Sequence, residues 1–425
     1  MKINTRYIAL IAALLLIADR GLAGCGAQTA SAEVPPAEIR MTATPAPTER
    51  PPIVGASFSD SSDGGHAIHS DGTAVSYANI IVTKTGAAEG DKADFYGENA
   101  AVLAENGAVL NLREASVTTD GTHANAVFSY GEGTVVNIAD STITTSGDYS
   151  GGLMTTGGGT TNADNLVVHT SGRSSAAIRS DRGGGVVNVT GGTYKTDGVG
   201  SPTVYSTADI TVRDAELSTS ASQGVVVEGK NAVKLENVTL TASNVQKNSG
   251  KSPWYQAVML YQSMSGDADE GTAAFTMLGG SLTNLNGDVF LVTNTRAVIK
   301  LTGTDIVNDD PEGVFLRAAA AGWGREGENG GHVELYTASQ RIDGDLLADE
   351  LSALDLYLGD GSELNGAVNP ANEGAVSVFL TDGAKWTLTG DSYVESLRCE
   401  ADSIRLNGHS LYVNGVLYTE GTAIA

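Results

Sequence analysis

Apolar residues recur at fixed offsets along most of the chain, as in the stretch VNIADSTITTSG at residues 136–147. In each copy, two apolar residues stand on either side of one polar residue. Five positions after the second of them comes a third apolar residue, which precedes a Thr/Ser-rich turn. This alternation is the period of a β-strand with one buried face. The third apolar residue of each copy is Val82, Val117, Ile143, Val168, Tyr194, Leu217, Leu240, Leu282 or Ile306.

Six of the eight spacings between these residues lie between 23 and 26 positions. A further apolar cluster follows each copy by about 8–10 residues, as at 225–227 and 289–291. Three short strands in about 24 residues indicate one turn of a coil that must stack on its neighbours to bury its apolar face. The sequence therefore predicts an all-β fold, a right-handed three-sided parallel β-helix (solenoid) with about 24 residues per turn.

The turns between strands have their own pattern. Gly121, Gly147, Gly172 and Gly198 recur at one corner, where we expect a positive φ that glycine adopts at little cost. A threonine column precedes the same corner, and we expect its side chains to stack there rather than to form a flat, ice-ordering array. Its members are Thr119, Thr145, Thr170, Thr196 and Thr219.

The regular spacing is interrupted twice within the main repeats, which we place at 56–332. An insertion is predicted at about 247–271 and a glycine-rich loop at 318–331. Residues 333–425 are predicted to form C-terminal β-helix turns. The stretch AKWTLTGDSYVESL at 384–397 resembles sequences of autotransporter passengers and adhesin-like β-helical surface proteins, and the repeat style resembles that of pectate-lyase-like β-helix proteins.

The N-terminus is typical of an exported protein. An apolar run from Tyr7 to Ala18 is too short to span a bilayer as a helix and indicates a signal peptide over residues 1–25. It ends in Leu22-Ala23-Gly24-Cys25, which resembles a bacterial lipobox and implies a lipid on Cys25, with cleavage without lipidation as the alternative. Residues 26–55 hold six of the ten prolines and are predicted to be a disordered tether. The expected location is the bacterial cell surface.

Charge and cysteine content restrict the partners and the stabilising forces. The formal net charge is −25, so the surface is expected to repel nucleic acid and anionic headgroups, leaving the lipid anchor as the membrane contact. Cys25 and Cys399 are the two cysteines in the sequence, and lipidation of the first would leave no internal disulfide.

The catalytic signatures of β-helical polysaccharide enzymes are missing from the sequence. The Gly-His-Gly and Arg-x-Lys motifs of polygalacturonase-like enzymes do not occur, and Asp309-Asp310 is interpreted as a polar corner. Lyase chemistry needs a basic side chain near clustered carboxylates, and the segment with Arg179, Asp181 and Arg182 is interpreted instead as an Arg–Asp pair at a turn.

We expect no dedicated metal site. Strand alternation would send His66 and His69 to opposite faces, and the segment GDADEG at 266–271 has glycine where an EF-hand loop needs its third ligand. Calcium binding stays open only through scattered surface carboxylates, and no other cofactor is predicted.

Aromatic residues in the two interruptions are the candidate binding groups. Trp254 and Tyr255 lie in the insertion and Trp323 in the glycine-rich loop. Loops on a rigid scaffold commonly carry binding, and flat rings suit sugars, although the rings could instead cover the side of the coil. Trp386 lies in an alternating strand and is expected in the core.

These features predict a non-catalytic cell-surface β-helix lipoprotein whose partners are extracellular glycans or a host or cell surface. The alternatives are an extracellular polysaccharide lyase or glycoside hydrolase of pectate-lyase-like fold, and a structural envelope or spacer protein.

Overall fold

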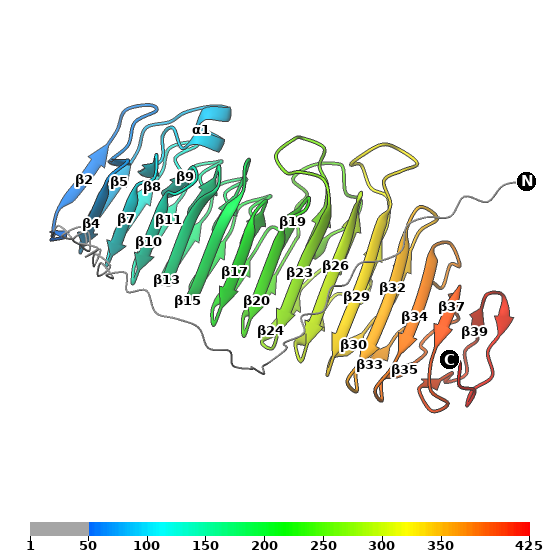
Figure 1. Cartoon of the computed structure of the whole chain (residues 1–425). Coiled ribbons are helices and arrows are strands. Elements are labelled where there is room, and N and C mark those ends of the chain that lie inside the picture. The colour runs from blue at the N-terminus through cyan, green and yellow to red at the C-terminus, as the bar shows by residue number, and fades with distance from the viewer. Residues whose placement is uncertain (1–50) are drawn as a thin grey trace, which may run out of the picture. The chain divides into compact units, whose positions relative to one another are not determined.

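The computed structural model describes residues 51–425, which form a stack of β-strand turns with one short helix, α1 (Asp91–Tyr96). Successive turns lie side by side along the stack (Figure 1). Cys25, the lipobox and the tether up to residue 50 lie outside the described residues. The stack begins earlier than predicted, because Ile53 and Val54 pair with Tyr77 and Ala78. The predicted all-β parallel solenoid is confirmed.

The first ladder of parallel strands runs along the whole stack. It consists of β1 (Ile53–Val54), β4 (Ala74–Ala78), β7 (Val109–Arg113), β10 (Val135–Ala139), β13 (Gly159–Thr170), β15 (Gly185–Thr196), β17 (Asp209–Arg213), β20 (Ala232–Glu236), β23 (Thr272–Leu278), β26 (Thr295–Thr302), β29 (Gly331–Ala338), β32 (Ala353–Gly359), β34 (Ala375–Leu380) and β37 (Ser396–Arg398).

The second ladder shares β13 and β15, which continue through the corner between the two ladders. It consists of β2 (Ser57–Asp60), β5 (Ile81–Lys84), β8 (Ser116–Thr119), β11 (Thr142–Thr145), β13, β15, β18 (Glu216–Thr219), β21 (Thr239–Ala242), β24 (Ser281–Asn284) and β27 (Asp305–Asn308). A four-stranded sheet follows, with β30 (Arg341–Asp343), β33 (Glu363–Asn365), β35 (Lys385–Thr387) and β38 (Ile404–Arg405).

The third ladder is again entirely parallel. It consists of β3 (Ile68–Asp71), β6 (Val102–Glu105), β9 (Val127–Tyr130), β12 (Leu153–Thr156), β14 (Ile178–Ser180), β16 (Val204–Ser206), β19 (Val225–Glu228), β22 (Gln256–Tyr261), β25 (Asp288–Thr293), β28 (Leu316–Ala318) and β31 (Leu346–Ala348). The C-terminal end of the stack carries β36 (Ser392–Val394), β39 (Leu411–Val413) and β40 (Val416–Leu417).

The strand register confirms the predicted apolar column. Val82 pairs with Val117, which pairs with Ile143, and the register continues through every predicted member to Ile306. Turns take 26 residues between Asn111 and Asn137 and 22 between Asp343 and Asn365. The inward side chains join into one continuous core, in which Trp386 is fully buried as predicted.

The predicted insertion at 247–271 contains a strand of the stack. β22 pairs with β19 and β25 in the third ladder, so this turn has two excursions, 243–255 and 262–271, on either side of it. Periodicity did not reveal β22 because all six of its residues are buried and its sequence does not alternate.

The glycine corner was predicted for the wrong reason. None of the four glycines has a positive φ. A Cβ on Gly172 would lie 1.9 Å from the carbonyl oxygen of Gly147, and one on Gly147 would lie 2.0 Å from that of Gly121. The turns approach so closely here that no side chain fits. Positive φ values fall instead at the corner between the first two ladders, at Asp140 (48°) and Asn165 (52°), since short polar side chains tolerate this conformation.

The threonine column points inward at the glycine corner. The hydroxyl of Thr145 donates to the carbonyl oxygen of Ser150 at 2.6 Å, and the hydroxyl of Ser150 donates to that of Gly121 at 2.8 Å. The amide N–H of Ser150 donates to the hydroxyl of Ser175 in the next turn at 2.9 Å. This buried ladder satisfies corner backbone groups that water cannot reach.

A buried lysine marks the N-terminal end of the same column. Lys84 pairs in register with Thr119, is fully buried, and lies 2.9 Å from a carboxylate oxygen of Asp60. Hydrogen bonds from Ser62 and then from Lys84 lower the pKa of Asp60. The lysine charge is therefore neutralised inside the first turns.

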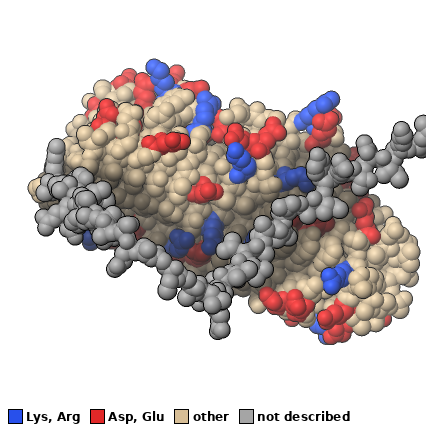
Figure 2. Space-filling model, in the orientation of Figure 1, with Lys and Arg blue, Asp and Glu red and all other residues tan. Residues whose placement is uncertain are grey.

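The C-terminal end is closed by the chain itself. β39 pairs parallel with β36, but β40 pairs antiparallel with β39, and Ile424 forms an antiparallel bridge to Cys399. Cys399 is a buried free thiol. Over the face of the stack in view, acidic and basic side chains are interspersed (Figure 2).

We predict that Gly172→Ala lowers the midpoint of urea unfolding by the equivalent of about 1–3 kcal/mol, because the new methyl group forces adjacent turns apart. Gly250→Ala is the control: a Cβ there meets nothing within 4 Å, so the midpoint should stay within about 0.5 kcal/mol of wild type. Equal effects of the two substitutions would contradict this explanation of the corner.

We predict that Asp60→Asn destabilises the protein more than the double change Asp60→Asn/Lys84→Met, because the single change leaves a buried ammonium group without its counter-ion. Since the folded-state pKa of Asp60 is depressed, the contribution of the pair is present above the ordinary value of 3.8 and is lost as pH falls through the folded value. Urea titrations at pH 7 compare the free energies of unfolding of the two variants, and titrations below pH 4 measure the loss of the pair's contribution. A double variant that is less stable at pH 7 than Asp60→Asn alone would contradict this explanation.

Candidate functional site

The outer face of the third ladder is largely covered by excursions from the stack. Figure 1 shows α1, a green loop near β23 and a yellow loop near β29 projecting from the same edge. Register places one row of side chains along the middle of this face. The row is His69, Leu103, Phe128, Met154, Arg179, Tyr205, Val226, Met259, Leu291, Arg317 and Leu347.

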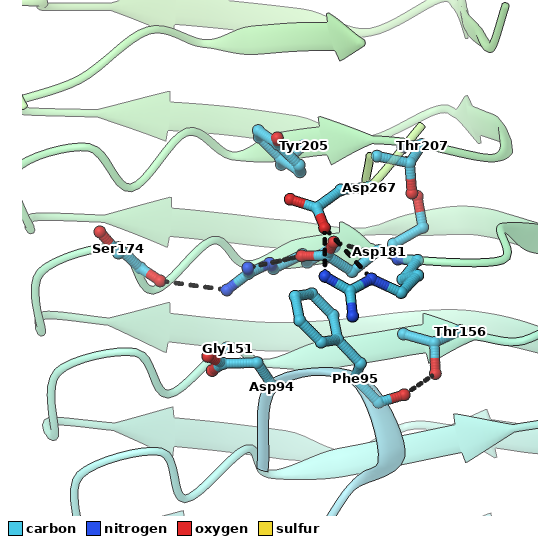
Figure 3. A network of polar contacts seen from close by, with 12 residues as sticks. Asp94, Phe95, Gly151, Thr156, Ser174, Asp181, Tyr205, Thr207 and Asp267 are labelled. Atoms are coloured by element: carbon cyan, nitrogen blue, oxygen red, sulfur yellow. Dashed lines mark hydrogen bonds and ion pairs between the residues drawn. The ribbon is translucent and has the colours of Figure 1, made fainter. Parts of the chain in front are cut away.

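Arg182 joins two of these excursions. Its guanidinium lies 3.9 Å from the ring centroid of Phe95 in α1 and 2.9 Å from a carboxylate oxygen of Asp267 in the 262–271 loop. A second carboxylate, Asp91 of α1, lies 3.3 Å away. Figure 3 shows Asp267 and Phe95 converging over the third ladder. The segment GDADEG therefore fastens a loop to the scaffold through Asp267.

Arg179 forms the Arg–Asp pair that the sequence suggested. Its guanidinium is 2.6 Å from Asp181, which is buried, while Arg179 itself is partly buried. Burial would lower the pKa of Arg179, but the Asp181 carboxylate reverses this and raises it. Arg179 therefore stays protonated and is unsuited to act as a catalytic base.

Next along the row is a buried cluster centred on Glu228. Its carboxylate accepts hydrogen bonds from the hydroxyls of Tyr205, Tyr261 and Ser263, the second at 2.9 Å. Burial first, and then Glu228 among neighbouring charges, raise the pKa of both tyrosines well above the ordinary value. The phenols therefore remain protonated donors, and the cluster fixes both rings on the face.

The two aromatic excursions meet over these tyrosines. The glycine-rich loop runs from residue 319 to 330, between β28 and β29. The amide N–H of Gly322 in this loop donates to the carbonyl oxygen of Lys251 at 2.7 Å, which joins it to the 243–255 loop. Arg173, from another turn, donates through Nε to the side-chain oxygen of Asn248 at 3.1 Å. Both loops are thus held in place by contacts between distant parts of the chain.

A hollow with a volume of about 120 Å³ lies between these loops and the outer face of the third ladder. Trp254 and Trp323 are both part of its wall, as are Tyr205 and Tyr261. The ring of Trp323 packs edge-on against Tyr261, with centroids 5.2 Å apart, so this residue both covers the stack and lines the hollow. The 243–255 loop adds four amide and hydroxyl side chains to the wall, those of Asn244, Asn248, Ser249 and Ser252.

Gln256 lines the hollow with a polar group that lacks a protein partner. The residue is 1% exposed, its Oε1 accepts no hydrogen bond, and its Nε2 contacts only the sulfur of Met259 at 3.3 Å. A buried amide without a partner costs about 1–3 kcal/mol. The Oε1 of Gln256 is one of nine buried side-chain oxygens without a partner within residues 51–425, and the one of them that lines this hollow.

Trp254 also lines a second hollow of about 200 Å³. Its ring lies over the guanidinium of Arg317 at 4.7 Å, and Arg317 is paired with buried Asp288 at 2.6 Å. Of the other polar side chains that line this hollow, Asp349 and Asn369 already accept backbone hydrogen bonds, and Glu373 is exposed to solvent.

The other predicted candidates lie elsewhere. Tyr255 is outside the wall of the first hollow, and its ring lies 4.9 Å from the ammonium group of Lys247. Asp310 accepts backbone hydrogen bonds from Gly287 and Glu312, which confirms the polar corner. The rings of His66 and His69 lie 5.2 Å apart, so placing them on opposite faces was wrong. No group of three or more His, Cys, Asp or Glu side chains within residues 51–425 is placed to hold a metal ion.

A broad groove on the first ladder is a weaker candidate. It is about 670 Å³ in volume and is lined by an amide ladder in which Asn137 donates to Asn111 and Asn162 donates to Asn137. Further along the same row, Tyr336 and Tyr357 stack in parallel 4.6 Å apart. The amides bond one another and the rings cover one another's faces, so both sets already have partners.

No protein-family model, curated protein sequence or solved structure matches this chain. Of the described residues, none belongs to a helix long and apolar enough to cross a membrane.

Sequence reasoning found Trp254 and Trp323 but missed Tyr205, Glu228, Tyr261 and Gln256. The last two lie in β22, which the interrupted spacing concealed. The short strand VYS at 204–206 offered a signal, since it lies between two recognised members of the third ladder.

We predict that Arg182→Met loosens both excursions that it joins, because the guanidinium bridges Phe95, Asp91 and Asp267. Hydrogen–deuterium exchange should become faster at 91–96 and 262–271 while the 243–255 loop keeps its wild-type rate. Arg341→Met, which removes an exposed ion pair with Asp343, should leave all three segments unchanged. Unchanged exchange in the Arg182 variant would show that the excursions are held by other contacts.

Proposed function

We propose that this protein is a bacterial cell-surface lipoprotein that binds carbohydrate in the hollow between Trp254 and Trp323. The observation that carries the proposal is the unpartnered side-chain oxygen of Gln256 in a hollow walled by aromatic rings. Tryptophan and tyrosine rings offer apolar faces to a sugar ring, while amide and hydroxyl groups bond its hydroxyls.

The fixed position of the wall supports a binding role. Tyr205 and Tyr261 are held by Glu228, and the loops are held by the Gly322–Lys251 and Arg173–Asn248 contacts. A site that is already ordered loses little conformational freedom when a ligand enters. The export signal, lipobox and tether expected at the N-terminus would present such a site at the cell surface.

The size of the hollow suggests what it takes. An apolar protein cavity of about 150 Å³ holds one benzene molecule, so about 120 Å³ corresponds to no more than one ring. The proposed ligand is therefore the end of a glycan rather than a length of chain.

The proposal is tested by applying the purified protein to a glycan array with and without calcium, and by measuring hits calorimetrically. Trp254→Ala and Trp323→Ala should each weaken binding about tenfold or more, since stacking of one ring contributes about 1–3 kcal/mol in the comparable case of a nucleobase. Tyr357→Ala, in the stacked row of the first ladder, should leave affinity unchanged. The absence of any array ligand would overturn the proposal.

Gln256→Met separates the binding role from folding. The change is nearly isosteric and removes the unpartnered amide, so the thermal midpoint should stay the same or rise while affinity for the array ligand falls at least tenfold. A variant that loses stability and keeps its affinity would show that the amide has a structural role.

A further inference from the structure

One basic side chain lines the Trp254–Trp323 hollow, and two more belong to or contact the loop that forms its wall. Lys247 belongs to its wall, Lys251 lies in the same loop, and Arg173 holds that loop through Asn248. None of these three side chains has a carboxylate within 4 Å among residues 51–425. No Asp or Glu lines the hollow.

These basic side chains have the opposite sign to the protein's net charge of −25. At physiological ionic strength, interactions between exposed charges are largely screened beyond about 8 Å. A ligand in the hollow therefore experiences Lys247 more strongly than distant surface carboxylates, and the Glu228 carboxylate behind the wall is already bonded to the hydroxyls of Tyr205 and Tyr261. The overall charge does not exclude an anionic ligand at this position.

Lys247 lines the hollow, and its ammonium group lies 4.9 Å from the ring centroid of Tyr255 outside it. Its ammonium group donates one hydrogen bond, to the carbonyl oxygen of Pro253 at 2.6 Å, and an ammonium group has three donors. The side chain is exposed at the mouth, while Gln256 lies buried further in. A sugar ring between the tryptophans could thus bond Gln256 through a hydroxyl and Lys247 through an exocyclic group.

We infer that the site selects a terminal sugar that carries a negative group, a carboxylate or a sulfate ester, and that Lys247 is the residue that selects it. This inference rests on the proposed carbohydrate-binding function and adds the chemical class of the ligand. Its physical basis is a charge-assisted hydrogen bond, which is about twice as strong as a neutral one.

The test compares sugars that differ only in the exocyclic group. Methyl β-glucoside, its 6-sulfate and the corresponding methyl glucuronide, with the matching galactose series, are titrated into the purified protein by calorimetry. At least one acidic member should bind about tenfold more tightly than its neutral parent, and the difference should shrink as salt is raised from 50 to 500 mM. Comparing the glucuronide with the 6-sulfate shows whether the site prefers a carboxylate or a sulfate ester.

Substitutions locate the selectivity. Lys247→Gln should bring acidic and neutral sugars to similar affinities, mainly by weakening the binding of the acidic ones, and Lys247→Arg should keep the preference. Lys300→Gln is the matched control, since Lys300 also lies near a tyrosine ring, 5.9 Å from Tyr336, with no carboxylate within 4 Å among residues 51–425. It should behave as wild type.

The outcomes separate this inference from the proposed function. Neutral sugars that bind as tightly as acidic ones, or a preference that survives in Lys247→Gln, overturn the inference and leave carbohydrate binding intact. No binding by any of the six sugars also overturns it, and the glycan array then decides the proposed function separately.

Discussion

The structure depends on the close approach of successive turns at the glycine corner. The position that runs through Gly121, Gly147 and Gly172 has no room for a Cβ, because the carbonyl oxygen of the preceding turn occupies that space. Glycine at this position permits the spacing that backbone hydrogen bonds between parallel strands impose, and the pairing fixes which residues stand above one another. The Thr145–Ser150 hydrogen bonds inside the corner and the outward row on the third ladder both follow from that register.

The strand register sets the positions of the residues that form the floor of the candidate site. Tyr205, Val226 and Met259 come from three successive turns and form a floor whose spacing is set by backbone hydrogen bonds. The loops above the floor have no such ladder and are held by contacts between distant parts of the chain, such as Gly322 to Lys251 and Arg173 to Asn248. Gln256 belongs to a strand of the stack, whereas Lys247 belongs to one of these loops.

The inward half of the fold could be predicted from the sequence, because a side chain facing a dry interior must be apolar at every turn. This constraint alone was enough to predict the apolar column from Val82 to Ile306. The corner glycines were recognised but misinterpreted, since composition does not distinguish a positive φ from a lack of space. β22 was missed because it is buried on both faces and carries no alternation. The meeting of the 243–255 and 319–330 loops depends on contacts between residues far apart in the sequence, and periodicity contains no information about these.

The closure of the C-terminal end has a consequence for self-association. A stack of parallel strands ordinarily ends in a row of open amide and carbonyl groups, which can recruit another chain in the same direction. Here β40 runs against β39 and the last residues fold back onto Cys399, so the final edge is reversed and partly occupied. A second molecule therefore cannot pair parallel with β39 on the edge that β40 occupies.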